Sequence, residues 1–178
     1  MKIVIGLGNI GKEYENTRHN VAWMFLDYLQ EKLDFKISEK NKNLDAFVSQ
    51  IYINNEKVVF AKPTTYMNLS GHAVQKLKNW YKVEDKDILV IFDDIDIPFG
   101  ETRYKLNGSG GTHNGMKNVV QMLNTKDIAR IKIGIGGIKH EKQDLVSFVL
   151  QKFTKEQITE LNSVFDDAYE KLKIFLDK

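Results

Sequence analysis

Short apolar runs, separated by longer stretches with helical spacing, constrain this chain of 178 residues more than any other feature. Residues 2–7, 88–92 and 131–135 consist mostly of Ile, Val, Leu and Phe. Strands of this kind are buried on both faces, which is typical of parallel sheets covered by helices. We therefore expect an α/β fold with a single domain over residues 1–178. Its three layers would be a mixed, mostly parallel twisted sheet and helices that flank both of its faces.

The remaining elements follow from periodicity and from end signals. Helices are predicted where apolar residues recur at helical spacing, over 21–33, 74–81, 116–123 and 158–175. Asn20 is the expected N-cap of the first helix, and Thr154 with Gln157 forms a capping box for the last. Residues 46–53 and 58–61 predict a hairpin, and residues 102–106 a short strand.

Composition excludes several classes of protein. The chain has no cysteine, so it forms no disulfide, no thiolate zinc site and no cysteine nucleophile, and it suits a reducing compartment. No apolar run reaches the length of a membrane span, so we expect no membrane partner. The net charge is only +2, and any binding of nucleic acid must therefore depend on a local basic patch. Residues 103–142 are rich in Arg and Lys.

Polar residues with useful chemistry lie in the segments that follow the predicted strands. Ligands of such sheets bind beyond the carboxyl ends of the strands, so the segments after residues 7, 61, 92 and 106 are where a site is expected. These segments carry Asn9, His19, Asn68, Asp93 and Asn114. Histidine is the usual general base near neutral pH, and each asparagine amide offers two donors and one acceptor oxygen. The set predicts a hydrolytic site.

Each motif has a plainer explanation when it is taken alone. The run GLGNIG at residues 6–11 matches a dinucleotide-binding pattern, but a polar stretch follows it where a helix would be needed. A tight turn therefore explains these glycines better than the dinucleotide-binding loop of a nucleotide-dependent oxidoreductase does. His19 alone could be a solvated loop residue, and Asp93 a turn anchor. The four histidines lack the spacing of a helical metal pair, and no G-x-S-x-G motif is present, so neither a metal nor a serine nucleophile is expected.

Seven blocks of the sequence form an ordered series between residues 3 and 153. They are GLGNIG (6–11) with Tyr14, TRHN (17–20), KPTTYMNLSG (62–71), DDIDIPFG (93–100), GSGGTHNG (108–115), KIGIG (132–136) and FVL (148–150). In this order they closely resemble the bacterial-type peptidyl-tRNA hydrolase family. One block could arise by chance, whereas the whole series is highly specific.

The resemblance implies an enzyme that hydrolyses the ester between a peptide, or an N-blocked amino acid, and the 3′-terminal ribose of transfer RNA (tRNA). It implies that His19 takes a proton from the attacking water and that Asp93 stabilises and orients His19. It further implies that Asn114 positions water or substrate and that Asn68 holds the peptide and the reacting carbonyl. Asn9 would help to distinguish N-blocked substrates from free aminoacyl esters.

The resemblance also implies how the tRNA is held. Tyr14 and Tyr66 match aromatic positions near the acceptor end, where bases or ribose can pack. Lys105 and Lys132 match basic positions that hold the tRNA 5′-phosphate, and the glycine-rich loop before residue 114 would add backbone donors. The partner is thus peptidyl-tRNA, with no cofactor and no metal, and the protein would be a cytoplasmic monomer.

Three positions depart from the family pattern. Ile10 replaces the usual proline, Thr112 replaces a glycine in the loop before residue 113, and residues 137–138 lack the usual arginine-proline pair. None is a predicted catalytic position. The main alternative function is a non-catalytic RNA-binding relative of the family, because a fold does not fix an activity. The complete set of five polar residues argues against this alternative.

Overall fold

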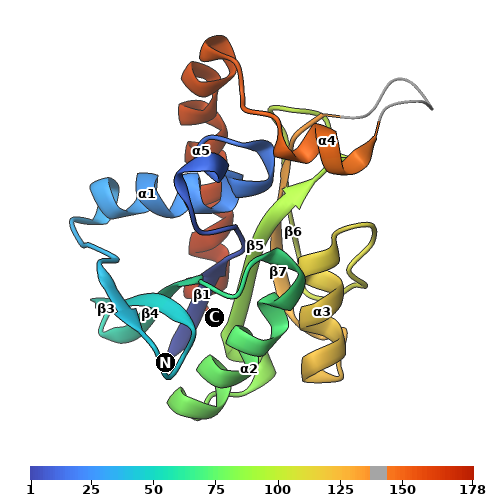
Figure 1. Cartoon of the computed structure of the whole chain (residues 1–178). Helices are drawn as coiled ribbons and strands as arrows, with labels where there is room; N and C mark the ends of the chain where they lie inside the picture. The colour runs from blue at the N-terminus through green and yellow to red at the C-terminus, as the bar shows by residue number, and fades with distance from the viewer. Residues whose placement is uncertain (137–143) are drawn as a thin grey trace.

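The computed structural model describes residues 1–136 and 144–178, in which seven strands form one sheet (Figure 1). The strands are β1 (Lys2–Gly6), β2 (Glu39–Asn41), β3 (Ala46–Ile53), β4 (Glu56–Pro63), β5 (Ile88–Asp94), β6 (Thr102–Lys105) and β7 (Ala129–Gly134). Their order across the sheet is β2-β3-β4-β1-β5-β7-β6. The central strands β4, β1, β5 and β7 are parallel, whereas β3 and β6 run antiparallel to their neighbours.

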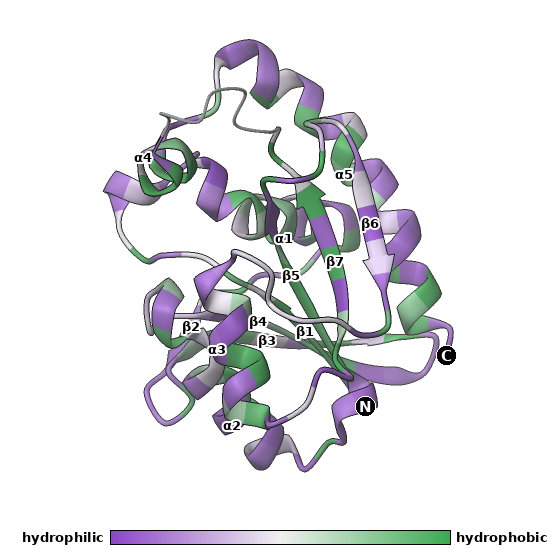
Figure 2. Ribbon diagram, turned by 90° about the vertical axis from the view of Figure 1, so that its right-hand side faces the viewer, coloured by the Kyte–Doolittle hydropathy of each residue, from purple (hydrophilic) through white to green (hydrophobic). Residues whose placement is uncertain are grey.

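Helices cover both faces of this sheet, as Figure 2 shows. They are α1 (Val21–Leu33), α2 (Ser70–Tyr81), α3 (Asn114–Leu123), α4 (Leu145–Leu150) and α5 (Lys155–Leu176). Short 3₁₀ turns lie between them: η1 (Lys12–Tyr14), η2 (Arg18–Asn20), η3 (Met67–Leu69) and η4 (Asp85–Asp87). Helices α1 and α5 pack on one face, and α2 and α3 on the other. The predicted three-layer, mostly parallel α/β fold is confirmed.

Strand β5 shows why the central strands are apolar at nearly every position. Leu89 and Ile91 belong to the cluster under α1 and α5, whereas Val90 and Phe92 belong to the cluster under α2 and α3. Successive side chains of a strand point to opposite faces, so a strand between two helical layers needs apolar residues at both sets of positions. Burying each such side chain stabilises the fold by about 1.5–3 kcal/mol.

The glycines at the end of β1 serve helix packing. A Cβ atom on Gly6 would lie 2.8 Å from the Leu26 side chain, and one on Gly8 would lie 2.6 Å from Trp23. Both contacts are with α1, which begins only at Val21. The glycine run therefore lets α1 approach the end of β1 and does not open a helix, as a dinucleotide-binding loop would.

Several local features differ from what the sequence predicts. The short β2 and α4 give no periodic signal of their own. Asn20 stands at the N-cap position of α1 but makes no side-chain cap, because its amide holds the backbone of Asn9 instead.

The predicted capping box of Thr154 and Gln157 at the start of α5 is confirmed. Among the described helices, none is long and apolar enough to cross a membrane.

Candidate active site

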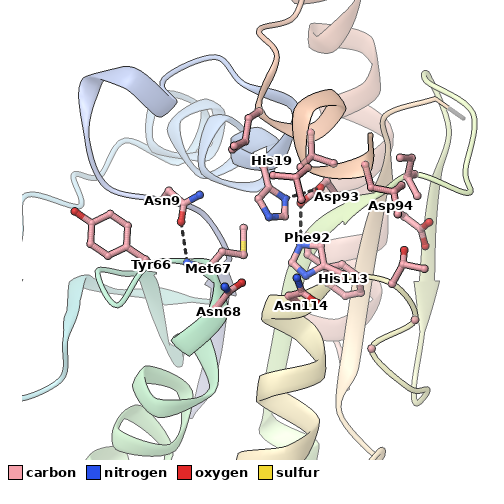
Figure 3. Close-up of a pocket in the computed structure, with 18 of the residues that line it drawn as sticks. Asn9, His19, Tyr66, Met67, Asn68, Phe92, Asp93, Asp94, His113 and Asn114 are labelled. Carbon is pink, nitrogen blue, oxygen red and sulfur yellow. Dashed lines mark hydrogen bonds and ion pairs between the residues drawn. The ribbon is translucent and has the colours of Figure 1, made fainter. Parts of the chain in front are cut away.

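A cavity of about 570 Å³ lies where β1, β4 and β5 end (Figure 3). The segments after these strands, the start of α3 and one face of α4 line it. Of the residues singled out from the sequence, the lining includes Asn9, Tyr14, His19, Tyr66, Asn68, Asp93, Asn114 and Lys132. The carboxyl ends of parallel strands meet at one edge of a sheet, which explains how segments so far apart in the chain converge.

His19 and Asp93 are in direct contact at the centre of this cavity. The Nδ1 atom of His19, in η2, lies 2.8 Å from Oδ2 of Asp93, which stands near the end of β5. The Asp93 side chain is only 3% exposed, whereas that of His19 is 14% exposed. A buried carboxylate thus holds one nitrogen of a ring that lines the cavity, and the Nε2 atom remains for chemistry.

His113 is a third member of this cluster, although it is not among the site residues predicted from the sequence. Its Nε2 atom lies 2.9 Å from Oδ1 of Asp93, and its Nδ1 atom accepts the backbone N–H of Met116 at 3.0 Å. Because Nδ1 accepts a hydrogen bond, it carries no proton, so the ring proton is on Nε2 and is donated to Asp93. The signal in the sequence was its position beside Asn114 at the start of a helix.

The pKa values of the central pair favour an ionised aspartate. Burial alone would raise the pKa of Asp93, but the facing histidines, His19 foremost, lower it well below its usual range. Burial alone would lower the pKa of His19, but the charge and hydrogen bond of Asp93 outweigh burial and raise it above 6.5. The Asp93 carboxylate therefore accepts from both rings, and the proton between it and His19 resides on Nδ1 of the histidine.

Asn9 has an amide whose orientation is fixed. Its Oδ1 atom accepts the backbone N–H of Met67 at 2.7 Å. Its own backbone N–H and C=O pair with the side-chain amide of Asn20, each at 2.9 Å. The oxygen of the Asn9 amide is therefore occupied, and its two N–H groups are the part that can meet a ligand. The site consequently offers a donor here, and a substrate must supply an acceptor.

Tyr66 has a strained backbone immediately before this contact. Its φ and ψ angles of 61° and 162° lie in a region that is normally restricted to glycine. The residue is 54% exposed, and its ring meets the Tyr14 ring edge to face, with 6.5 Å between the centroids. Strain of this kind costs about 1–3 kcal/mol and is concentrated at functional sites. Here it accompanies an aromatic pair that lines the cavity, in which Tyr66 is exposed and Tyr14 is half-buried.

The remaining amides and lysines are placed differently from one another. Asn68 and Asn114 are exposed residues of η3 and α3 that line the cavity. Lys132 lines it from β7, with its ammonium 3.5 Å from Asp94. Lys105 is exposed but does not line the cavity. The reason is that β6 runs antiparallel and pairs Lys105 with Arg130 at the start of β7 rather than with Lys132.

The loop with the unusual Thr112 keeps a normal backbone. Gly111 takes the left-handed conformation, with φ of 58°, and Thr112 does not require it. The His113 N–H bonds to the Gly110 carbonyl at 3.0 Å, which closes the turn before α3. The departure at residue 112 therefore leaves the placement of His113 intact. Residues 137–138, another departure from the family pattern, lie outside the described residues.

His19, Asp93 and His113 are the kind of cluster that could in principle hold a metal ion. The hydrogen bonds argue against it. His113 cannot offer Nε2 as a ligand while that atom carries the ring proton, and moving the proton to Nδ1 would oppose the N–H of Met116. The arrangement instead suits proton transfer, with one carboxylate that orients one base.

Comparisons with known proteins agree on one family. The sequence matches the family model described as peptidyl-tRNA hydrolase over residues 3–178. A peptidyl-tRNA hydrolase of Exiguobacterium sp. is 43% identical over 177 residues, 99% of this chain and 94% of that protein. One of Mesoplasma florum is 44% identical over 158 residues, 89% of this chain and 83% of that protein. The crystal structure of peptidyl-tRNA hydrolase from Acinetobacter baumannii is 28% identical with a TM-score of 0.91, covering 99% of this chain and 89% of that one.

Proposed function

Because the chain belongs to the peptidyl-tRNA hydrolase family and hydrolyses the ester between a peptide and tRNA, we propose that His19 is the general base of this reaction. The observation that carries the proposal is the hydrogen bond of 2.8 Å between His19 and the buried carboxylate of Asp93. This bond places the proton of the neutral ring on Nδ1 and leaves the lone pair of Nε2 for a water molecule. General-base catalysis of this kind contributes about 10²–10⁴-fold.

The proposed reaction uses only water and side chains of the protein and needs no cofactor. His19 Nε2 takes a proton from water as the water oxygen attacks the ester carbonyl carbon. The tetrahedral intermediate collapses, the bond to the ribose oxygen breaks, and the imidazolium returns the proton to that oxygen. Asp93 stays ionised throughout and stabilises the imidazolium. The products are tRNA with its terminal hydroxyl restored and a peptide carboxylic acid, which loses its proton to solvent and leaves as the carboxylate.

The three asparagines hold the acyl side of the substrate. The free N–H groups of Asn9 donate to the amide carbonyl of an N-blocked substrate. An unblocked aminoacyl ester presents an ammonium group instead. This group is only a donor, so it cannot accept a hydrogen bond from the N–H groups of Asn9. Asn68 and Asn114 supply exposed amides in the same cavity for the peptide backbone and the attacking water. The contacts of the three asparagines therefore favour blocked esters over free aminoacyl esters.

The tRNA side of the substrate is held by aromatic rings and by positive charge. The half-buried Tyr14 and the exposed Tyr66 form an aromatic pair on which the terminal base or ribose packs. Lys132 meets the 5′-phosphate inside the cavity, whereas Lys105 lies on the neighbouring strand β6, opposite Arg130 and outside the lining. We expect the protein to act as a cytoplasmic monomer, which light scattering and cell fractionation can measure.

One experiment tests the general-base assignment. The protein and its His19→Ala variant are incubated with N-acetyl-aminoacyl-tRNA and with the same tRNA left unblocked. We expect the unaltered protein to cleave only the blocked ester, and the variant to bind tRNA with similar affinity but to cleave neither. Ester cleavage by the variant at the normal rate would refute the assignment of His19. Failure of the unaltered protein to cleave the blocked ester would refute the function itself.

A further inference from the structure

Arg18, the residue before His19, is a buried cation that the proposed chemistry does not use. It is 9% exposed, and burial lowers the pKa of its guanidinium. Among the described residues no carboxylate forms an ion pair with it, and its Nε atom is buried without a hydrogen-bond partner. A buried charge without an acidic partner carries a desolvation cost, so its contacts call for an explanation.

The contacts of Arg18 lie at the end of helix α4. Its Nη1 atom donates to the carbonyl of Phe148 at 3.3 Å and to the side chain of Gln151 at 3.2 Å. The centre of the guanidinium stands 4.4 Å from the centroid of the Phe148 ring, within the range of a cation–π interaction. The backbone N–H of Arg18 also bonds to the Gln151 carbonyl at 3.0 Å. The residue thus ties η2, which carries His19, to α4.

Helix α4 packs on the core through Phe148 and Val149, and its other apolar residues face the cavity. It spans six residues, none of which is fully buried. Leu145, Val146 and Leu150 are 46%, 60% and 38% exposed, and together with Val149 they line the cavity. Figure 3 shows α4 above His19 and Asp93, with apolar side chains pointing into the cavity. The helix therefore gives the site an apolar wall.

We propose that Arg18 is a positioning residue that fixes this apolar wall relative to His19, and that the wall receives an apolar side chain of the acyl group next to the ester. The proposal rests on the proposed function and names the substrate class that this part of the site prefers. An apolar side chain there removes the exposed leucine and valine surfaces from water, which favours binding. A glycyl ester, with no side chain, gains nothing from the wall.

The test compares two substrates in variants of this contact. Arg18→Met keeps a long apolar stem among the phenylalanine rings but removes the guanidinium. It is assayed with N-acetyl-phenylalanyl-tRNA and N-acetyl-glycyl-tRNA, and folding is checked by circular dichroism. We expect kcat/KM to fall by roughly 3- to 30-fold for the phenylalanyl ester, as loss of a desolvated cation–π contact implies. We expect less than about a threefold change for the glycyl ester, and Arg18→Lys to lie between.

A second variant covers the case in which Arg18→Met does not fold. Phe148→Leu weakens the same contact from the side of α4 without altering the buried charge, and it should show the same selective loss. Lys152→Ala, an exposed change in the same segment, is the control and should change neither rate. Equal losses on both esters, or none, would overturn the role of Arg18. Failure of the unaltered protein to cleave either ester would instead refute the proposed function.

Discussion

The ring of His113 donates from Nε2 to the Oδ1 atom of Asp93 at 2.9 Å. The direction of this bond is set by Met116, whose N–H occupies the other ring nitrogen at 3.0 Å. Asp93 therefore has one oxygen satisfied by a fixed donor and turns the other to His19. The start of α3 thus holds the carboxylate that orients the proposed base.

His113→Ala should destabilise the fold and weaken catalysis at the same time. It removes one donor to a buried carboxylate and the cap on the Met116 N–H. A hydrogen bond to a charged group contributes about 1.5–3 kcal/mol, so we expect a loss of this order in the free energy of unfolding, measured with urea. His72→Ala, an exposed change on α2, is the matched control. A variant as stable as the control would show that the bond to Asp93 contributes nothing.

Asp93→Asn should lower kcat strongly and the free energy of unfolding only slightly. The amide oxygen would accept from His113, so the amide nitrogen would face His19 and donate to its Nδ1 atom. His19 would then carry its proton on Nε2, the atom needed as base, and we expect kcat to fall by roughly 10²–10⁴-fold. Pre-steady-state hydrolysis of N-acetyl-aminoacyl-tRNA measures this. A loss below tenfold would show that the tautomer of His19 is not set by Asp93.

The pH dependence of kcat/KM should report the raised pKa of His19. A general base must be unprotonated, so activity is lost as the pH falls through that pKa, and the midpoint of the acid limb should lie above 6.5. In Asp93→Asn the residual activity should have its acid limb at lower pH, because burial then acts without the opposing carboxylate. Rates are measured between about pH 5 and 9 after subtraction of spontaneous ester hydrolysis. An unshifted limb in the variant would contradict the coupling.

Asn9→Asp should weaken the discrimination between blocked and free esters. The new carboxylate can still accept the N–H of Met67, but its second oxygen replaces a donor with an acceptor that attracts an ammonium group. The ratio of kcat/KM for N-acetyl-aminoacyl-tRNA to that for aminoacyl-tRNA should fall by about tenfold or more, equivalent to 1.4 kcal/mol. Asn9→Ala separates loss of the donor from gain of the acceptor. An unchanged ratio would mean that Asn9 plays no part in the choice of substrate.

The sequence predicted the fold well because both faces of the sheet are buried. The apolar run of β5 requires helices on each side, and the helix over Val21–Leu33 has the bounds that its periodicity indicated. The site was harder to predict because its contacts join distant segments. His19 and Asp93 are 74 residues apart, and their meeting depends on the pairing of β1 with β5.

Three placements depend on three-dimensional context that the sequence does not show. Asn20 looks like a helix cap, yet its amide holds Asn9. His113 looks like a solvated loop histidine until α3 and β5 bring it to Asp93. Lys105 and Lys132 look equivalent, but the antiparallel direction of β6 leaves only Lys132 in the cavity lining. Periodicity carries no information about any of these three placements.

That difference between the two lysines gives a final prediction. Lys132→Met should raise KM for 5′-phosphorylated substrate and leave kcat nearly unchanged, because it removes a contact to phosphate and none to the ester. The slope of log(kcat/KM) against log[salt] should become shallower by about one unit. Lys105→Met should show a smaller effect, since Lys105 lies outside the cavity lining. Lys86→Met is the control for net charge, because Lys86 lies in η4, just before the start of β5, and does not line the cavity. If Lys132→Met matches this control, or if it acts equally on substrate without the 5′-phosphate, then Lys132 does not bind that phosphate.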